Sequence, residues 1–292
     1  MAKFTLQEFR KQYPSDAACL DKIFKMRYGN ITHCPHCKEE TTFRRVTTRR
    51  CYQCRKCYEQ FYPTAGTIFE KTRVPLSDWF YIIFLFSTTR NGVSAKEIER
   101  LLGVTYKCAF RMGHQIRKLF ETIPQDKLKG FVEFDESWVG GSQSNSISRQ
   151  VPPQKMVFGL VERLGSVRAF HVKNIKAESL IPLIQSHVDK QSWVYTDENS
   201  TYVQLEKLGF DKHQRIAHGR KEYVVRDIST NTIEGYFSQL KRMIKGTHIQ
   251  VSEKYFQNYI NESCFRYNLR HAPFQMFNVI VDRISEQGDS VE

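Results

Sequence analysis

The sequence predicts a multidomain protein of the α+β class, on three observations. Residues 31–75 are rich in cysteine, threonine, arginine and aromatic residues and have no helical period. Residues 76–125 read as helices, and residues 126–285 alternate strand patterns with helical ones. A helical lead-in over residues 1–30 precedes these parts. A polar tail over residues 286–292, with the composition of a disordered segment, follows them.

The length of the chain limits the number of domains, and its net charge indicates the kind of molecule that it binds. At 292 residues, 40% of them hydrophobic, the chain is long enough for two or three compact units with real cores. The formal net charge of +13 favours a polyanion, most simply nucleic acid, although charge does not separate DNA from RNA. The longest apolar run, residues 79–86, is too short for a membrane span, and the N-terminus carries no secretory pattern. We therefore expect a cytoplasmic protein with reduced cysteines and no membrane partner.

The lead-in is predicted to contain two helices. Apolar residues such as Phe9, Leu20 and Ile23 form a loose helical stripe. Ser15 and Asp16 stand where the second helix would begin, and serine is a favoured N-cap residue.

Two Cys-x-x-Cys motifs mark the second segment and are separated by sixteen residues. A gap of two residues lets both sulfurs of a motif face one tetrahedral ion, and residues 40–52 suit a β-hairpin that brings the motifs together. The pattern predicts a zinc ribbon with one structural Zn²⁺ and four thiolate ligands: Cys34, Cys37, Cys54 and Cys57. Cys51 also forms a Cys-x-x-Cys with Cys54. We prefer the pair 54/57, because Phe61 then follows in a strand, and we expect Cys51 to be a spare thiol.

Four arginines lie between the two motifs. A hairpin that carries them fits contact with nucleic-acid phosphates or a groove, although a merely soluble hairpin face is the alternative. The candidate DNA-contacting residues of this segment are Arg44, Arg45, Arg49 and Arg50.

The third segment predicts a helix-turn-helix. An apolar helix over residues 76–88 follows Pro75, and a second helix over residues 94–102 precedes a turn at Gly103. A third helix over residues 105–117 completes the motif, although any helical hairpin has a similar pattern. Six side chains are expected to pack between the last two helices: Ile98, Leu101, Leu102, Val104, Ala109 and Met112. Four are expected to face outward toward DNA: Tyr106, Lys107, Arg111 and Gln115.

The fourth segment reads as strands and helices in the order β-β-β-α-β-α-β-α. The expected strands are residues 131–139, 155–163, 167–175, 192–196 and 214–217, and the expected helices are residues 177–188, 202–208 and 230–245. This order is that of a ribonuclease-H-like fold. In that fold the first strand, the end of the fourth strand and a late helix converge on one site.

Three acidic residues stand at those three places: Asp135, Asp197 and Glu234. Carboxylates from distant segments can together hold two divalent cations that flank a phosphodiester. Singly, each acid has a plainer explanation, such as a turn aspartate or a first-turn glutamate that favours the helix dipole. Glu136 follows Asp135, but neighbouring strand residues face opposite ways, so only one of them is expected to point at the metals. Lys241 lies seven positions after Glu234 and is either a phosphate contact or a solvated lysine.

Several motifs resemble those of bacterial insertion-sequence transposases with an N-terminal zinc ribbon, a group related to the eukaryotic Merlin elements. The resemblance covers nearly the whole chain. It is carried by Cys34-x-x-Cys37, Tyr52-x-Cys54-x-x-Cys57-x-x-x-Phe61, Gly66-Thr67-Ile68-Phe69, the run from Val132 to Gly141, the run from Asn231 to Arg242, and Phe265-Arg266-Tyr267-Asn268-x-Arg270.

The resemblance implies a DDE-type transposase that binds the terminal inverted repeats of its own element, cleaves at the ends and transfers 3′-hydroxyl strands into target DNA. The third catalytic position in this group is glutamate or asparagine, which leaves Glu234 and Asn231 as alternatives. We favour Glu234, because a carboxylate is the better ligand for a hard cation. Lys241 is added as a catalytic residue and Arg242 as a DNA contact.

The implied cofactors are two Mg²⁺ (or Mn²⁺) ions for each active site, besides the Zn²⁺. The implied partners are double-stranded DNA, from the terminal repeats and from the target, and further copies of the chain in a homodimer or higher oligomer. A bacterial, nucleoid-associated location follows. Two rival functions stay open: a DNA-binding regulator whose carboxylate domain is inactive, and a structure-specific nuclease that cuts without joining.

Overall fold

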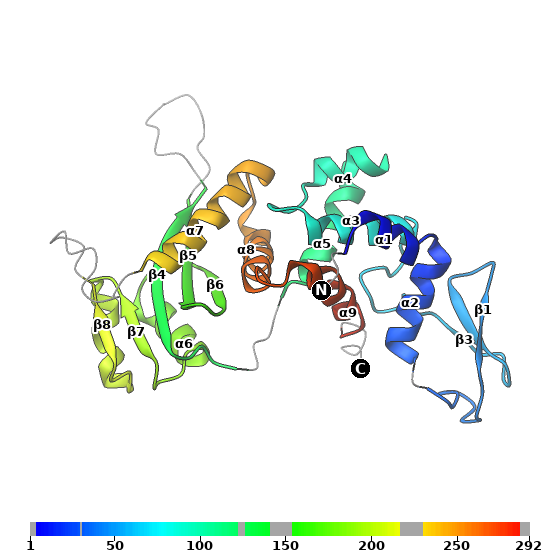
Figure 1. Cartoon of the computed structure of the whole chain (residues 1–292), viewed down its shortest axis with the longest axis horizontal. Helices are drawn as coiled ribbons and strands as arrows, with labels where there is room; N and C mark the ends of the chain where they lie inside the picture. Colours follow the sequence, from blue (N-terminus) through cyan, green and yellow to red (C-terminus); the bar gives the residue numbers. More distant parts are fainter. Residues whose placement is uncertain (1–3, 30, 122–125, 141–153, 217–229, 287–292) are drawn as a thin grey trace. The chain divides into compact units, whose positions relative to one another are not determined.

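The computed structural model describes residues 4–29, 31–121, 126–140, 154–216 and 230–286. By its contacts the chain divides into two compact units, shown in Figure 1. Unit 1 comprises Met1–Leu119 and Ala272–Glu292, and unit 2 comprises Phe120–His271. The C-terminal helix therefore belongs to the same unit as the N-terminal elements, whereas the sequence grouped it with residues 126–285. The predicted tail, residues 286–292, lies almost wholly outside the described residues.

Unit 1 begins with two capped helices. Helix α1 spans Leu6–Gln12 and helix α2 spans Asp16–Tyr28. The Ser15 hydroxyl accepts a hydrogen bond from the Ala18 amide, so serine is the N-cap of α2 as predicted. Three antiparallel strands follow: β1 (Phe43–Val46), β2 (Cys51–Cys54) and β3 (Gln60–Phe61).

The helices of unit 1 enclose an aromatic core. Their bounds are α3 (Leu76–Thr88), α4 (Ala95–Leu102), α5 (Tyr106–Lys118), the 3-10 turn η4 (Pro273–Gln275) and α9 (Met276–Glu286). The ring of Phe277 on α9 lies 4.7 Å from that of Phe4 and 5.5 Å from that of Tyr13. These ring contacts explain why α9 packs with the N-terminal helices rather than with the second unit.

Helices α4 and α5 are joined by Gly103, which has φ +65° in the left-handed region that glycine adopts at low cost. Ser94 and Thr105 cap the two helices, as the pattern predicts. The prediction for Leu101 is wrong, because this side chain is 47% exposed. Ile98 and Leu102 are four positions apart and therefore share the face of α4 that packs inward. Leu101 lies at the edge of that face.

Unit 2 is built on a five-stranded mixed sheet with strand order β6-β5-β4-β7-β8. The strands are β4 (Phe131–Val139), β5 (Lys155–Glu162), β6 (Val167–Val172), β7 (Trp193–Thr196) and β8 (His213–Arg215). Strands β4, β5 and β6 are antiparallel neighbours, whereas β7 runs parallel to β4 and β8 runs parallel to β7.

Helical elements cover both faces of this sheet (Figure 1). They are α6 (Ala177–His187), the 3-10 helix η1 (Ser200–Leu208), α7 (Asn231–Met243), the π-helical turn η3 (Ile244–His248) and α8 (Glu253–Asn268). Side chains from alternate strand positions join one hydrophobic cluster with α7 and α8, and a second cluster with α6 and η1. Among the described residues no helix is long and apolar enough to cross a membrane.

Candidate active site and zinc-ribbon site

The two Cys-x-x-Cys motifs form matching turns that bring four sulfurs together. In the first turn the Lys38 amide donates to the Cys34 carbonyl at 2.8 Å, and in the second the Tyr58 amide donates to the Cys54 carbonyl at 3.2 Å. Lys38 and Tyr58 both have positive φ, 62° and 63°. The sulfurs of Cys34, Cys37, Cys54 and Cys57 all lie within 4.8 Å of one another.

The spacing of these sulfurs fits a structural Zn²⁺. Four thiolates at the usual Zn–S distance of about 2.3 Å around a tetrahedral ion are separated by roughly 3.8 Å. The Cys34 and Cys57 sulfurs lie 3.7 Å apart. Cys51 stands outside this group: it is buried in β2, and its sulfur lies 3.6 Å from the Gln60 side-chain oxygen. The four sulfurs that meet are therefore those chosen from the spacing.

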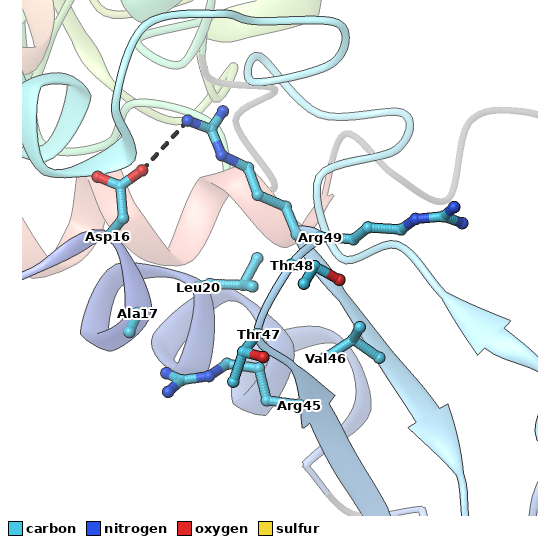
Figure 2. Close-up of a pocket in the computed structure, with 9 residues that line it drawn as sticks. Asp16, Ala17, Leu20, Arg45, Val46, Thr47, Thr48 and Arg49 are labelled. Atoms are coloured by element: carbon cyan, nitrogen blue, oxygen red, sulfur yellow. Dashed lines mark hydrogen bonds and ion pairs between the residues drawn. The ribbon is translucent and has the colours of Figure 1, made fainter.

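The arginines of the hairpin have different surroundings (Figure 2). The Arg50 guanidinium forms an ion pair with Asp16 at 3.1 Å and donates to the Thr72 and Val74 carbonyls, each at 3.2 Å. This guanidinium ties the hairpin to α2 and to the segment before α3, and its role toward DNA stays a prediction. Arg49 is exposed, and Figure 2 shows its side chain extending away from Asp16.

The other two hairpin arginines are exposed and make weaker contacts. Arg45 lies 3.5 Å from Asp21, and Arg44 donates to the Gln53 side chain at 3.3 Å. On α5, Tyr106, Lys107 and Arg111 are exposed, and Gln115 is half-buried. Their role toward DNA stays a prediction.

In unit 2, the sheet brings Asp135 and Asp197 together. Asp135 lies on β4, and Asp197 follows the last residue of β7. The parallel register pairs Glu133 with Tyr195, so two residues further along both strands Asp135 comes level with Asp197. One carboxylate oxygen from each of Asp135, Glu136 and Asp197 lies within 4.8 Å of the others. Three oxygen donors of this kind fit a hard divalent cation such as Mg²⁺ or Mn²⁺.

Glu136 belongs to this cluster, contrary to the expectation that only one of the two adjacent acids points there. The pairing between β4 and β7 ends at Glu133, so beyond it the strand edge is open and acids from both faces can approach it. The Glu136 amide also donates to the Asp135 carboxylate at 2.7 Å, which turns that carboxylate toward its neighbour. The carboxylate cluster is therefore Asp135, Glu136 and Asp197.

The pKa of Glu136 is raised from 4.5 to about 7, mainly by burial and to a smaller extent by the nearby charges of Asp197 and Asp135, against a hydrogen bond from Tyr202 that lowers it. The buried Tyr202 hydroxyl on η1 donates to a Glu136 carboxylate oxygen. Burial also raises the pKa of Tyr202 well above its usual range. Sequence reasoning missed Tyr202, because a tyrosine on a short apolar helix gives no signal of such a partner.

The candidates for the third position lie on the first turn of α7 and are exposed. Glu234 accepts a hydrogen bond from the Thr230 hydroxyl at 3.0 Å, and Asn231 is the first residue of the helix. Within the described residues, neither is part of the carboxylate cluster. Lys241 and Arg242, near the other end of α7, are exposed as well.

Comparison with known proteins gives a consistent result. Residues 127–268 match the family model of the ISXO2-like transposase domain, and residues 14–60 match that of the transposase zinc-ribbon domain, which begins within the predicted lead-in. An uncharacterized protein in transposable element ISH50 of Halobacterium salinarum is 27% identical in an alignment of 285 residues that covers 90% of this chain and 94% of that protein. A chain from the simian T-cell lymphotropic virus intasome in complex with PP2A regulatory subunit B56 gamma gives a TM-score of 0.29 at 15% identity, covering 61% of this chain and 66% of that chain, a likeness too slight to bear on the fold.

Proposed function

Because the chain belongs to the insertion-sequence transposases with an N-terminal zinc ribbon, a family of enzymes that act on DNA, we propose that it cuts the ends of its own mobile element and joins them to target DNA. The observation that carries this proposal is the carboxylate cluster at the point where the parallel pairing of β4 with β7 ends. Acids gathered at such a place suit phosphodiester chemistry better than a purely structural role, because like charges repel unless a cation joins them.

A ribonuclease-H-like fold is the architecture that we propose for unit 2. It is supported by the strand order β6-β5-β4-β7-β8, by three antiparallel strands followed by parallel ones, and by the placement of α6 between β6 and β7. In this arrangement the central strand β4 supplies Asp135 and its parallel neighbour supplies Asp197.

Asp135 and Asp197 would each bind divalent cations, and Glu136 and Glu234 are the candidates for the remaining carboxylate, with Asn231 as the alternative on α7. Bound Mg²⁺ supplies Lewis-acid activation of the phosphodiester and of the attacking hydroxyl. Tyr202 holds Glu136 by its hydrogen bond and so fixes one side of the cluster. Lys241 offers a positive charge to a phosphate of the DNA. The chemistry needs no covalent protein intermediate, so no serine or tyrosine nucleophile is assigned.

Recognition of DNA would fall to unit 1. The exposed arginines Arg44, Arg45 and Arg49 of the ribbon, and the exposed face of α5, present positive charge to phosphates. Helices α4 and α5, joined by a glycine turn, support a helix-turn-helix role, in which α5 reads base edges. Two or more copies of the chain would pair the two ends of the element.

The test is cleavage of a double-stranded oligonucleotide that carries the terminal inverted repeat, in the presence of Mg²⁺. Asp135→Asn should lower the cleavage rate by at least about a hundredfold and leave binding of the repeat intact. Asp211→Asn is the matched control, because Asp211 is exposed and lies outside the carboxylate cluster. Unchanged cleavage by Asp135→Asn would reject the assignment. Cleavage by the wild type without strand transfer would favour the nuclease, and repeat binding without cleavage would favour the regulator.

A further inference from the structure

Glu133 is a fully buried carboxylate that the proposed reaction does not use. Its exposed fraction is 0%, and it lies on the face of β4 that carries Asp135. Its two oxygens accept four hydrogen bonds. The Oε1 atom accepts from Arg163 Nε at 2.7 Å and from the Thr232 hydroxyl at 2.9 Å, and the Oε2 atom accepts from the amides of Thr232 and Ile233 at 2.9 and 3.0 Å.

Three of these donors belong to the first turn of α7. The first amides of a helix have no partner inside the helix, so a buried helix start needs acceptors from elsewhere. Thr230, the residue before α7, makes no side-chain cap for it. Glu133 therefore supplies, from the strand, the cap that the helix lacks. The favourable charge of a carboxylate at a helix N-terminus strengthens this link.

The fourth donor connects the same carboxylate to β7. Arg163 follows the end of β5, and its guanidinium lies 4.7 Å from the centre of the Tyr195 ring. Tyr195 stands two residues before Asp197 on β7. One buried ion pair thus joins the strand of Asp135, the strand that leads to Asp197 and the helix that carries Asn231 and Glu234.

The packing beneath α7 shows how closely the helix is held. Gly159 of β5 pairs with Asp135, and a Cβ atom placed there would lie 2.7 Å from Ile233 and 2.9 Å from Phe237. The helix therefore lies directly on the strands at the level of the catalytic aspartate. A shift of its first turn would move Asn231 and Glu234 relative to the carboxylate cluster.

We propose that Glu133 is a positioning residue, which fixes the first turn of α7 against the strands that carry Asp135 and Asp197, and so sets the place of the third metal-binding side chain. The inference rests on the proposed function, since it assigns α7 a part in that site. A merely structural ion pair is the competing explanation. Glu262 offers the comparison, because it is equally buried and pairs with Arg266 at 2.9 Å, but within helix α8.

The test variant is Glu133→Gln, which keeps the shape of the side chain. All four partners of Glu133 are donors, and a glutamine amide would turn its own N–H groups toward two of them. Amide exchange at Thr232 and Ile233 should become at least about tenfold faster in the full chain. Glu262→Gln should leave exchange at these two amides unchanged. Exchange that is unchanged in Glu133→Gln, or equally fast in both variants, would overturn the proposal.

The second readout is Mn²⁺ binding, measured by calorimetry without DNA, together with cleavage of the terminal-repeat oligonucleotide. Residues that orient metal ligands typically contribute a factor of about 10–100 in affinity or activity, so Glu133→Gln should weaken Mn²⁺ binding by that factor. If Glu133 acts through α7, adding Glu133→Gln to the double variant Asn231→Ala/Glu234→Gln should change the Mn²⁺ affinity by less than about twofold. A further loss as large as in the single variant would show that it acts elsewhere.

Should Glu133→Gln fail to fold, Thr232→Val provides the same test in milder form. It keeps the shape of the threonine and removes one donor to Glu133, so exchange at Ile233 should rise and cleavage should fall several-fold. Wild-type exchange and cleavage in Thr232→Val would count against the inference. If the wild-type chain neither binds Mn²⁺ nor cleaves, the proposed function has failed, and the exchange result alone decides whether Glu133 holds α7.

Discussion

The cysteine cluster and the carboxylate cluster are two candidate metal sites built in opposite ways. All four cysteines lie within residues 34–57, on two turns with the same hydrogen bonds. The carboxylates come from residues 135, 136 and 197, and only the pairing of β4 with β7 brings them level. Local turns therefore bring the ligands of the first site together, whereas strand pairing brings those of the second site together.

This difference predicts that folding depends on the metal ion at the cysteine cluster but not at the carboxylate cluster. A small ribbon with a three-stranded sheet buries little apolar surface, so its metal contributes much of its folding free energy. The carboxylate cluster stands on a sheet with a hydrophobic cluster on each face, so we expect the sheet to be stable without an ion. Loss of Mg²⁺ should therefore stop the chemistry and leave the fold, whereas loss of Zn²⁺ should unfold the ribbon.

The largest expected effect is that of removing zinc. Structural Zn²⁺ contributes about 10–16 kcal/mol of apparent binding free energy in small zinc domains at neutral pH, so Cys54→Ser should release the ion and unfold residues 31–62. Metal analysis should fall from one Zn²⁺ per chain to none, with rapid amide exchange confined to the ribbon. Cys51→Ser is the control and should retain one Zn²⁺. A zinc-free ribbon with slow exchange would remove the contrast between the two sites.

Where local signals decide structure, the sequence predicted it closely. Helix α3 spans the predicted residues 76–88 and β4 spans the predicted residues 131–139, because Pro75 marks the start of one apolar run and Gly130 and Gly140 flank the other. The matching turns of the cysteine motifs follow from their spacing for the same reason. The pairing of Asp135 with Asp197 was predictable only because the order of strands and helices pointed to one sheet topology.

Sequence reasoning was incomplete where a long-range contact decides the surroundings of a side chain. Arg50 follows Arg49 in sequence, yet its surroundings are set by Asp16 and by two carbonyls more than twenty residues away. Glu136 reaches the carboxylate cluster because the pairing of β4 with β7 ends at Glu133, and a strand pattern does not reveal the register in which two strands pair. Glu133 gave one usable signal: a carboxylate on the buried face of a strand must find donors, and these proved to be the start of α7 and Arg163.

A titration sharpens the comparison on the carboxylate side. Burial raises the pKa of Glu136 from its ordinary value of 4.5 to about 7, so the folded, metal-free chain holds this proton more tightly than the unfolded chain does. The contribution of Glu136 to the unfolding free energy of unit 2 should be greatest below pH 4.5. It should fall by roughly 3 kcal/mol as the pH rises toward 7. The measurement is the difference in unfolding free energy between the wild type and Glu136→Gln across this range, without metal.

Added Mn²⁺ is the control for this titration, because the cation favours the charged carboxylate. The difference in unfolding free energy between the wild type and Glu136→Gln should then no longer change with pH. A difference that is already flat without metal would mean that Glu136 is not buried among the other acids. The cluster would then be more like the exposed acids found on most surfaces.

Two glycines test how closely α7 must lie on the strands. Gly159→Ala should destabilise unit 2 by about 1–3 kcal/mol, because the new methyl group meets Ile233 and Phe237 at less than 3 Å. Gly235→Ala, on α7 itself, meets nothing within 4 Å and should stabilise the helix by up to about 1 kcal/mol. Thermal or urea unfolding of the two variants measures whether each change lowers or raises the unfolding free energy. Equal effects would show that the helix has room to move, contrary to a site that depends on long-range packing.

The smallest effects distinguish the neighbouring arginines of the ribbon. Arg50→Ala removes a half-buried ion pair and two hydrogen bonds, and should destabilise unit 1 by about 1–2 kcal/mol. Arg49→Ala removes an exposed side chain and should leave stability within about 0.5 kcal/mol. If Arg49 contacts a phosphate, its variant should instead lower the slope of log affinity for DNA against log salt by about one. A loss of stability in Arg49→Ala would show that the hairpin uses this arginine internally, as it uses Arg50. An unchanged salt slope would show that the ribbon contacts DNA through other residues.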